Sequence, residues 1–385
     1  MVAACPFPCP RGTPTRVFRM AEALGRRGHD VHVVTYHLGE EPGPMPFRIH
    51  RIQNVAGYRK LSPGPTWRKL LQVDVLLAAK LLRVITSQAI ELIHAHHYEG
   101  LLVSLYARRS TGLPVLYDAH TLLESELPSY RTGVPARLTR ALGRWLDVSL
   151  PWRADEIVTV TEQIRAALLR GSRADAERIT VVASGVEPER FEFGRRRPPE
   201  NGGVRTLIFT GNLASYQGIE VLLRSFRLVL DHRRDVRLVI VTHSSFEPYE
   251  GLARELQVRE FIDVVPATRD DVPAQLAAAD VAVNPRVQCD GAPQKLLNYM
   301  AAGKPIVSFR GSGQILDHGQ TGWLVEGHDA AAFALGTLRC LDDPDLARAL
   351  GRAAHRAAAD YRWDTAATLI EAVYDRLASS RPRVA

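Results

Sequence analysis

Short apolar runs alternate along this chain with longer segments in which apolar residues recur every three or four positions. The first runs cover residues 1–5 and 31–36, and the segment between them, from about 15 to 27, carries its apolar residues on one helical face. Gly28 follows that segment and is typical of a helix stop. This order predicts a strand, a helix and a second, parallel strand. Because the opening run is short, we expect the natural chain to begin further upstream.

The same alternation continues to the end of the chain. Further strands are predicted at 47–52, 92–95, 114–117, 156–160, 179–182, 205–210, 237–242, 262–265, 281–284 and 305–309. Residues 194–203 read GRRRPPENGG, and such a proline- and glycine-rich run is typical of a linker. We therefore predict an N-terminal domain at 1–193 and a C-terminal domain at 204–359. The last segment, 360–380, contains an amphipathic helix.

Strands that alternate with helices in this way predict an α/β fold with two Rossmann-like domains, each built on a doubly wound parallel sheet. The length of 385 residues suits two domains better than one. Sheets of this kind bind ligands at the carboxyl ends of their strands. We therefore expect the two domains to face a shared cleft that holds the functional site.

Composition limits the class of protein, its possible partners and its cellular compartment. With 46% hydrophobic and 24% charged residues, the chain is typical of a folded globular protein. Its net charge of +7 fits nucleic acid, an anionic membrane or a phosphorylated small molecule, but an arginine excess of this kind can equally reflect genome base composition. The four cysteines lack metal or disulfide spacing, and no run of about 18 apolar residues occurs. We expect a cytoplasmic protein, with peripheral contact to an anionic membrane left open.

Two features of the N-terminal domain are candidates for anion binding and metal binding. The loop that opens the first helix contains Gly12 and Thr13, and its backbone N–H groups could bind an anion. His94, His96 and His97 lie at the end of a predicted strand, but no cysteine or carboxylate accompanies them at metal-ligand spacing. We interpret them as polar lining of a sugar pocket, with ordinary loop histidines as the alternative, and predict no metal.

His120 directly follows another predicted strand, so we expect it at the carboxyl end of the sheet, facing the cleft. A single histidine in such a position is more often structural than functional, and both interpretations stay open on placement alone. Neither a G-x-G-x-x-G fingerprint nor a Walker A motif is present, which argues against a nicotinamide dehydrogenase and a P-loop enzyme.

Two segments of the C-terminal domain combine a strand end, a glycine turn and a helix start: FTGNLASYQGIEVLL at 209–223 and DGAPQKLLNYMAAGKPIV at 290–307. Such turns direct backbone amides at a phosphate, although a capped helix explains each feature alone. The candidate residues in and near these segments are Gly211, Asn212, Gln217, Arg286, Asp290, Gly291, Lys295 and Asn298. By contrast, we interpret Asp343-Pro344-Asp345 as a helix N-cap followed by proline, and not as a metal-binding D-x-D.

Taken together, these segments resemble the retaining glycosyltransferases of family 4, or group 1, which have the two-Rossmann GT-B architecture. The resemblance covers essentially the whole chain, and its specificity lies in the order of seven segments: RGTPTRVFRMAEALGRRGHDVHVVT, DAHTLLESELP, ADEIVTVTE, SGVEPERF, TGNLASYQG, DGAPQKLLNYMAAGKPIV and HGQTGWLV. It implies a nucleotide-sugar donor held mainly by the second domain, an acceptor held mainly by the first, and no metal or other cofactor. It also implies that the final helix packs back on the first domain.

The resemblance further implies roles for individual residues. His120 matches the family histidine that lies beside the donor sugar. Asp290 and Asn298 stand where the family has an E-x7-E pair that orients the sugar and the ribose, so His120 and Asp290 are the predicted catalytic residues. Gly12 and Thr13 would approach the phosphate or the acceptor.

This chain departs from the family pattern at the donor diphosphate. The family's G-R-L followed by K-G appears here as Gly211-Asn212-Leu213 and Gln217-Gly218, so two cations are missing. A charge-assisted hydrogen bond contributes about 1.5–3 kcal/mol, and losing two without compensation would weaken donor binding strongly. Arg286 and Lys295 are the natural replacements.

We therefore predict a retaining glycosyltransferase that moves a sugar from a nucleoside-diphosphate sugar to a glycan, lipid or small-molecule acceptor, with no nucleic-acid partner. The substituted charges favour one alternative, a non-catalytic subunit that binds a nucleotide sugar. Another GT-B enzyme, such as a nucleotide-sugar epimerase, is the second alternative.

Overall fold

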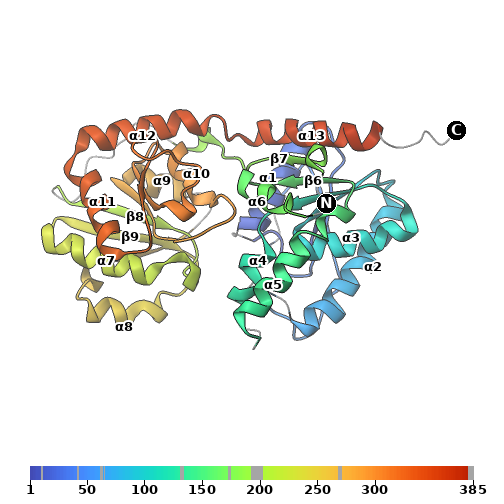
Figure 1. Ribbon diagram of the computed structural model, residues 1–385, viewed down its shortest axis with the longest axis horizontal. Helices are drawn as coiled ribbons and strands as arrows, with labels where there is room; N and C mark the ends of the chain where they lie inside the picture. Colours follow the sequence, from blue (N-terminus) through green and yellow to red (C-terminus); the bar gives the residue numbers. More distant parts are fainter. Residues whose placement is uncertain are drawn as a thin grey trace. The chain divides into compact units, whose positions relative to one another are not determined.

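The chain forms two compact units. The structure, a computed structural model, describes residues 1–9, 12–40, 43–60, 64, 66–130, 134–171, 175–191, 203–267 and 271–379. Unit 1 comprises Met1–Gly185 and Trp363–Ala385, and unit 2 comprises Val186–Arg362 (Figure 1). The predicted boundary at residue 193 is therefore displaced by eight residues, and the predicted linker lies outside the described residues apart from Gly203. The chain passes from one unit to the other after Gly185 and again after Arg362. Next to these two points, within unit 2, Val186 N donates a hydrogen bond to Tyr361 O at 2.7 Å.

Unit 1 is built on a seven-stranded, wholly parallel sheet in the order β3-β2-β1-β4-β5-β6-β7. The strands are β1 (Val2–Ala3), β2 (His32–Thr35), β3 (Arg48–Arg51), β4 (Ile93–His96), β5 (Val115–Ala119), β6 (Glu156–Thr159) and β7 (Ile179–Val181). The α-helices are α1 (Gly12–Arg26), α2 (Asp74–Ser87), α3 (His97–Thr111), α4 (Leu123–Glu126), α5 (Ala136–Asp147), α6 (Glu162–Leu168) and α13 (Trp363–Ser379). A π-helical turn, η1 (Lys69–Val73), leads into α2.

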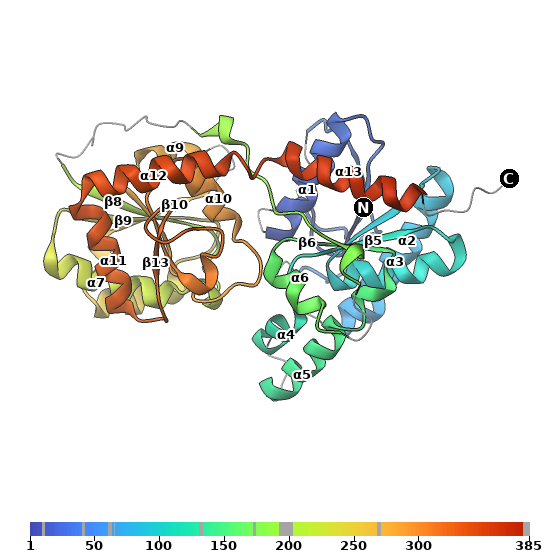
Figure 2. The same cartoon turned by 45° about the horizontal axis from the view of Figure 1, so that its top comes forward.

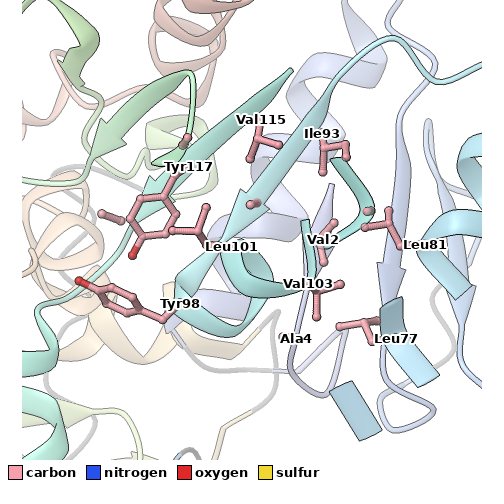
Figure 3. Close-up of a cluster of buried hydrophobic side chains, with 14 of the residues drawn as sticks. Val2, Ala4, Leu77, Leu81, Ile93, Tyr98, Leu101, Val103, Val115 and Tyr117 are labelled. Atoms are coloured by element: carbon pink, nitrogen blue, oxygen red, sulfur yellow. The ribbon is translucent and has the colours of Figure 1, made fainter. Parts of the chain in front are cut away.

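The helices of unit 1 cover both faces of this sheet because successive strand residues point to opposite sides. Val2 and Val34 belong to the core beneath α2, α3 and α6, whereas their neighbours Ala3 and Val33 belong to the core beneath α1 and α13. Figure 3 shows part of the first core, where residues of α2 and α3 meet the strands. The final helix thus completes unit 1, as the amphipathic stripe of its sequence requires.

Unit 2 repeats the plan with a six-stranded parallel sheet in the order β10-β9-β8-β11-β12-β13. The strands are β8 (Arg205–Thr210), β9 (Val236–Thr242), β10 (Ile262–Pro266), β11 (Val281–Asn284), β12 (Ile306–Phe309) and β13 (Trp323–Val325). The α-helices are α7 (Ile219–His232), α8 (Glu247–Glu255), α9 (Asp271–Ala278), α10 (Gln294–Ala301), α11 (Ala330–Asp342) and α12 (Pro344–Ala358). Cores on the two faces involve α7, α8 and α11 on one side and α9, α10 and α12 on the other.

The predicted α/β class with two doubly wound parallel sheets is confirmed. Asp343 also behaves as predicted, since its carboxylate accepts a hydrogen bond from Leu346 N at the start of α12. Two details differ. The first helix begins at Gly12, three residues earlier than its apolar stripe indicated, and the short edge strand β13 was not predicted.

The packing of α5 generates a test of the fold. A Cβ placed on Gly143, in the middle of α5, would lie 2.3 Å from Leu123 O, so the close approach of the two backbones requires glycine. Gly143→Ala is expected to destabilise the protein by about 1–3 kcal/mol through overpacking. Gly251, in the middle of α8, has nothing within 4 Å of its Cβ position, so Gly251→Ala should stabilise by up to about 1 kcal/mol. Calorimetric melting of both variants checks these opposite signs, and equal shifts would contradict the packing argument.

Candidate functional site

Buried polar residues gather at the carboxyl ends of β4 and β5 in unit 1. His94 and His96 lie on β4, and the strand register places His96 directly beside Asp118 on β5. All three side chains are almost fully buried. The imidazoles of His94 and His96 stack with ring centroids 4.3 Å apart, and Tyr374 of α13 lies 2.8 Å from His94 Nδ1.

Asp118 is held by Arg16, which comes from α1. Arg16 Nε donates to Asp118 Oδ2 at 2.9 Å and Nη2 donates to Oδ1 at 3.2 Å. The same guanidinium also donates to Val182 O at 2.8 Å and to Ser184 Oγ at 3.3 Å. Burial alone would raise the pKa of Asp118, but Arg16 and His120 hold it well below its usual range. The carboxylate is therefore ionised and fixed in orientation.

His120, the residue that follows β5, lies beside this network. Its Nε2 is 3.2 Å from His96 Nδ1 and 3.5 Å from Asp118 Oδ2, and its Nδ1 is 3.3 Å from Thr13 Oγ1. The structure thus brings together two predicted site residues, His120 and Thr13, while Gly12 is exposed at the first position of α1. Burial lowers the pKa of His120 although Asp118 opposes the shift. A neutral imidazole in this position can donate or accept a hydrogen bond without carrying charge.

His97 is separated from His94 and His96 and forms a second cluster. It has a φ of 64°, a left-handed conformation that is uncommon for residues other than glycine. Its ring nitrogens lie 2.6 Å from Glu99 Oε2 and 3.1 Å from Glu126 Oε2, and Lys69 Nζ donates to Glu99 Oε1 at 2.6 Å. Burial would lower the pKa of His97, but the two carboxylates raise it to about 10. His97 is therefore an imidazolium within an ion-pair cluster.

The spacing of residues along the sequence did not reveal that a carboxylate lies beside the histidines. Among the described residues, His94, His96 and Asp118 form one group whose potential ligand atoms lie within 4.8 Å of one another. Asp118 was not associated with the histidines because it comes from the neighbouring strand. Both of its oxygens already accept hydrogen bonds from Arg16, and a divalent cation would lie against that positive charge. The geometry therefore favours a hydrogen-bonded ion pair over a metal centre.

In unit 2, the loop after β8 contains the predicted residues Gly211, Asn212 and Gln217. Gly211 has a φ of 136°, and Asn212 Nδ2 donates to Tyr216 Oη at 3.1 Å. The loop ends at Gly218, where a Cβ would lie 2.2 Å from Pro285 O. Glycine is therefore required for the loop to pack against the segment that follows β11.

Lys295, the second residue of α10, reaches this loop. Its Nζ donates to Gln217 Oε1 at 2.7 Å and lies 4.0 Å from the centroid of the Phe209 ring. A Cβ placed on Gly211 would be 3.4 Å from the same Nζ. Burial and the nearby charge of Arg286 lower the pKa of Lys295 well below its usual value. An anion beside Lys295 would oppose both effects.

The other predicted residues of unit 2 lie in the segment that follows β11 and in α10. The Arg286 guanidinium lies 4.9 Å from the Tyr216 ring centroid, and its Nε donates to Gln288 O at 2.8 Å. The half-buried Asp290 and Gly291 lie in the turn before α10, and Asn298 lies within that helix. Sequence reasoning missed four residues that complete the two sites: Arg16, Asp118, Phe209 and Tyr216. The signal available for Asp118 was its position on the strand next to the two histidines.

Comparison with known proteins supports the family suggested by the motifs. A family profile described as Glycosyltransferase Family 4 matches residues 10–190, and one described as Glycosyl transferases group 1 matches residues 204–343. Two proteins named D-inositol 3-phosphate glycosyltransferase are each 28% identical to this chain. The match to the Streptomyces avermitilis protein spans 74% of this chain and 65% of that protein, and the match to the Corynebacterium diphtheriae protein spans 94% and 89%.

Solved structures show the same architecture. Sucrose-phosphate synthase of Thermosynechococcus elongatus superposes with a TM-score of 0.82 at 20% identity, covering 98% of this chain and 96% of that one. HepE of Anabaena, in complex with UDP and glucose, superposes with a TM-score of 0.72 at 16% identity, covering 98% of each chain. The two parallel-sheet units thus define a protein of the GT-B fold. The chain belongs to the family 4, or group 1, glycosyltransferases and is a glycosyltransferase.

The His97 cluster generates a pH-dependence test. Because the pKa of His97 rises from about 6.5 in the unfolded chain to about 10 in the folded one, its contribution to stability is complete below pH 6.5 and is lost as the pH rises toward 10. His97→Asn, which tolerates the left-handed backbone, should therefore flatten the decline in unfolding free energy over this range. The decline is at most about 1.4 kcal/mol per pH unit for one group. Urea titrations at several pH values measure it, and parallel curves for both proteins would contradict the assignment.

Proposed function

We propose that this glycosyltransferase moves a sugar from a nucleoside-diphosphate sugar to an acceptor hydroxyl with retention of anomeric configuration. The observation that carries the proposal is the position of Lys295. Its ammonium group contacts Gln217, the residue that stands in place of the lysine of the family's K-G motif. The binding of UDP and glucose by HepE, a protein of the same fold, supports a donor of this class.

Unit 2 would hold the donor diphosphate. The leaving diphosphate carries about two negative charges, and the N-terminus of a helix supplies only about half a positive charge. A side-chain cation is therefore needed, and Lys295, with Arg286 nearby, would supply it, because a bound anion would oppose the burial and the Arg286 charge that lower its pKa. Asp290, Gly291 and Asn298 lie at or near the start of the same helix and would bind the sugar and ribose hydroxyls. Asn212 and Gly211 would line the pocket at the end of β8.

Unit 1 would supply the neutral imidazole of His120 to the donor sugar. In the reaction the bond between the anomeric carbon and the diphosphate oxygen breaks and a bond to the acceptor oxygen forms. The acceptor proton passes to the departing diphosphate oxygen. The residues of the chain then act by positioning the reactants and by stabilising charge. Arg16 and Asp118 fix the surroundings of His120, and Thr13 contacts its Nδ1.

The proposal includes no metal or other cofactor, since Lys295 and Arg286 supply the positive charge that a divalent cation would bring. The acceptor class stays broad: a glycan, a small molecule or a lipid-linked sugar. A lipid-linked acceptor would place the enzyme at the cytoplasmic face of a membrane. The alternative, a subunit that binds a nucleotide sugar without catalysis, is favoured only by the substituted charges, among them those at Asn212 and Gln217.

A donor screen tests the proposed activity. One of the UDP-, GDP-, ADP- and dTDP-sugars is expected to raise the melting temperature, because a ligand that binds only the folded state stabilises it. That donor should be hydrolysed slowly without acceptor, and EDTA should leave the rate unchanged. His120→Ala should lower this rate at least tenfold while donor affinity changes little, since His120 acts mainly on the transition state. Donor binding without any hydrolysis would favour the non-catalytic alternative, and silencing by EDTA would contradict metal independence.

The role of Lys295 has its own test. Lys295→Met should weaken binding of the free nucleoside diphosphate tenfold or more, about 1.4 kcal/mol, while binding of the nucleoside stays nearly the same. Arg254→Met, which removes one positive charge from the exposed surface of α8, serves as the charge-matched control. Isothermal calorimetry measures both ligands. Equal losses for nucleoside and diphosphate would show that Lys295 does not bind the phosphates.

A further inference from the structure

Helix α5 exposes its apolar side. Leu138, Leu142 and Trp145 are 55%, 51% and 63% exposed, respectively. A helix at the surface of a globular protein normally buries such a stripe and exposes its polar side. The helix buries instead Thr139, Gly143 and Asp147. Figure 2 shows α4 and α5 projecting from the rest of unit 1.

Three sectors follow one another around α5. At 100° per residue, the buried residues Thr139, Gly143 and Asp147 share one side. Three arginines, Arg137, Arg140 and Arg144, occupy the next sector, and the apolar residues Ala141, Trp145, Leu138 and Leu142 occupy the third. The only acidic residue of the helix is Asp147, which is 3% exposed. The exposed surface of α5 is thus apolar and positively charged, with no negative charge of its own.

This arrangement is held firmly by unit 1. Asp147 accepts hydrogen bonds from Leu123 N and Glu124 N, both at 2.9 Å, and from the Tyr98 hydroxyl. Gly143 packs against the backbone of Leu123. The helix is therefore fixed through backbone contacts, a buried carboxylate and the partly buried Leu146, which packs against the first core, while Leu138, Leu142 and Trp145 remain exposed.

A second exposed apolar stripe lies on the segment that leads into α2. Trp67, Leu71 and Val75 are 80%, 71% and 58% exposed and recur every four residues from just before η1 into the start of α2. Tyr130, which follows α4, lies against Gly64, because a Cβ on this glycine would be 2.8 Å from its Cδ1. The segments that precede the two stripes along the chain thus meet at Gly64 and Tyr130.

We propose that α5 is an interfacial helix that docks unit 1 on an anionic lipid bilayer. Leu138, Leu142 and Trp145 would enter the boundary between headgroups and acyl chains, and the arginines would contact lipid phosphates. A bilayer fits this surface better than a protein groove, because the arginines match a surface of uniform negative charge and tryptophan is favoured at that depth. In the part of the chain that the structure describes, none of the helices has the length and apolarity of a membrane span. This inference goes beyond the proposed function, since docking needs neither donor nor turnover.

Vesicle sedimentation tests the docking helix. The full chain should bind vesicles of phosphatidylcholine with phosphatidylglycerol, bind pure phosphatidylcholine at least tenfold more weakly, and lose affinity at high salt. Leu142→Glu with Trp145→Glu should reduce binding at least tenfold, and Arg137→Gln with Arg140→Gln should reduce it mainly on anionic vesicles. Leu335→Glu on α11, a residue 65% exposed, is the matched apolar control, and Arg352→Gln with Arg356→Gln on α12 is the matched charge control. Both controls should bind like the wild type.

Several outcomes would overturn the proposal. If the wild-type protein does not bind anionic vesicles, α5 has no role in membrane docking. The same conclusion follows if an α5 variant binds these vesicles as tightly as the wild type does. If sedimentation equilibrium instead shows a dimer that becomes monomeric in Leu142→Glu with Trp145→Glu, the stripe is a contact between copies of the chain. Donor hydrolysis measured on the same variants without lipid separates the two hypotheses, because it should equal the wild-type rate whether or not docking fails.

Discussion

The arrangement of unit 1 depends on the buried pair between Arg16 and Asp118. Removing two charges from water carries a large desolvation cost, which is offset only when further hydrogen bonds satisfy the remaining groups. Here the guanidinium also donates to Val182 O and Ser184 Oγ, so one side chain of α1 joins the end of β5 to the segment after β7. Breaking such a pair from one side typically costs about 3–5 kcal/mol. The same carboxylate lies beside the imidazoles of His96 and His120, so stability and the candidate chemistry share one group.

The cation of unit 2 is held differently. Among the described residues, Lys295 contacts a neutral amide and an aromatic ring, and no carboxylate forms an ion pair with it. The charge of Arg16 is therefore already paired with a carboxylate. Lys295 instead contacts the amide oxygen of Gln217 and the ring of Phe209, which are both uncharged. A group of the second kind gains most from the arrival of an anion. Under the proposed function, this difference would suit unit 1 to orient a neutral sugar and unit 2 to bind a diphosphate.

Much of the fold could be predicted from sequence because strand and helix periodicities recur strictly in both halves. Runs such as RTLIFT coincide with the observed β8. By contrast, β13 was not predicted, because it has only three residues and follows a glycine turn. The site was harder to predict. Gly12, Thr13 and His120 were chosen for their places at strand ends and helix starts, but Arg16 lies 102 positions from Asp118, and no local pattern joins them. The contact between Lys295 and Gln217 spans 78 positions and depends on how two loops pack.

The position of α13 has a consequence for the order in which the protein can fold during synthesis. Its buried residues Ala366, Ile370 and Val373 cover the sheet face that also carries α1, and Tyr374 reaches His94. Since α13 follows all of unit 2 along the chain, the ribosome completes unit 2 before it delivers the last piece of unit 1. Until then unit 1 has an uncovered apolar face, which is a hazard for aggregation. Unit 2 is contiguous and can complete its cores first, so the domain that begins earlier in the sequence finishes later.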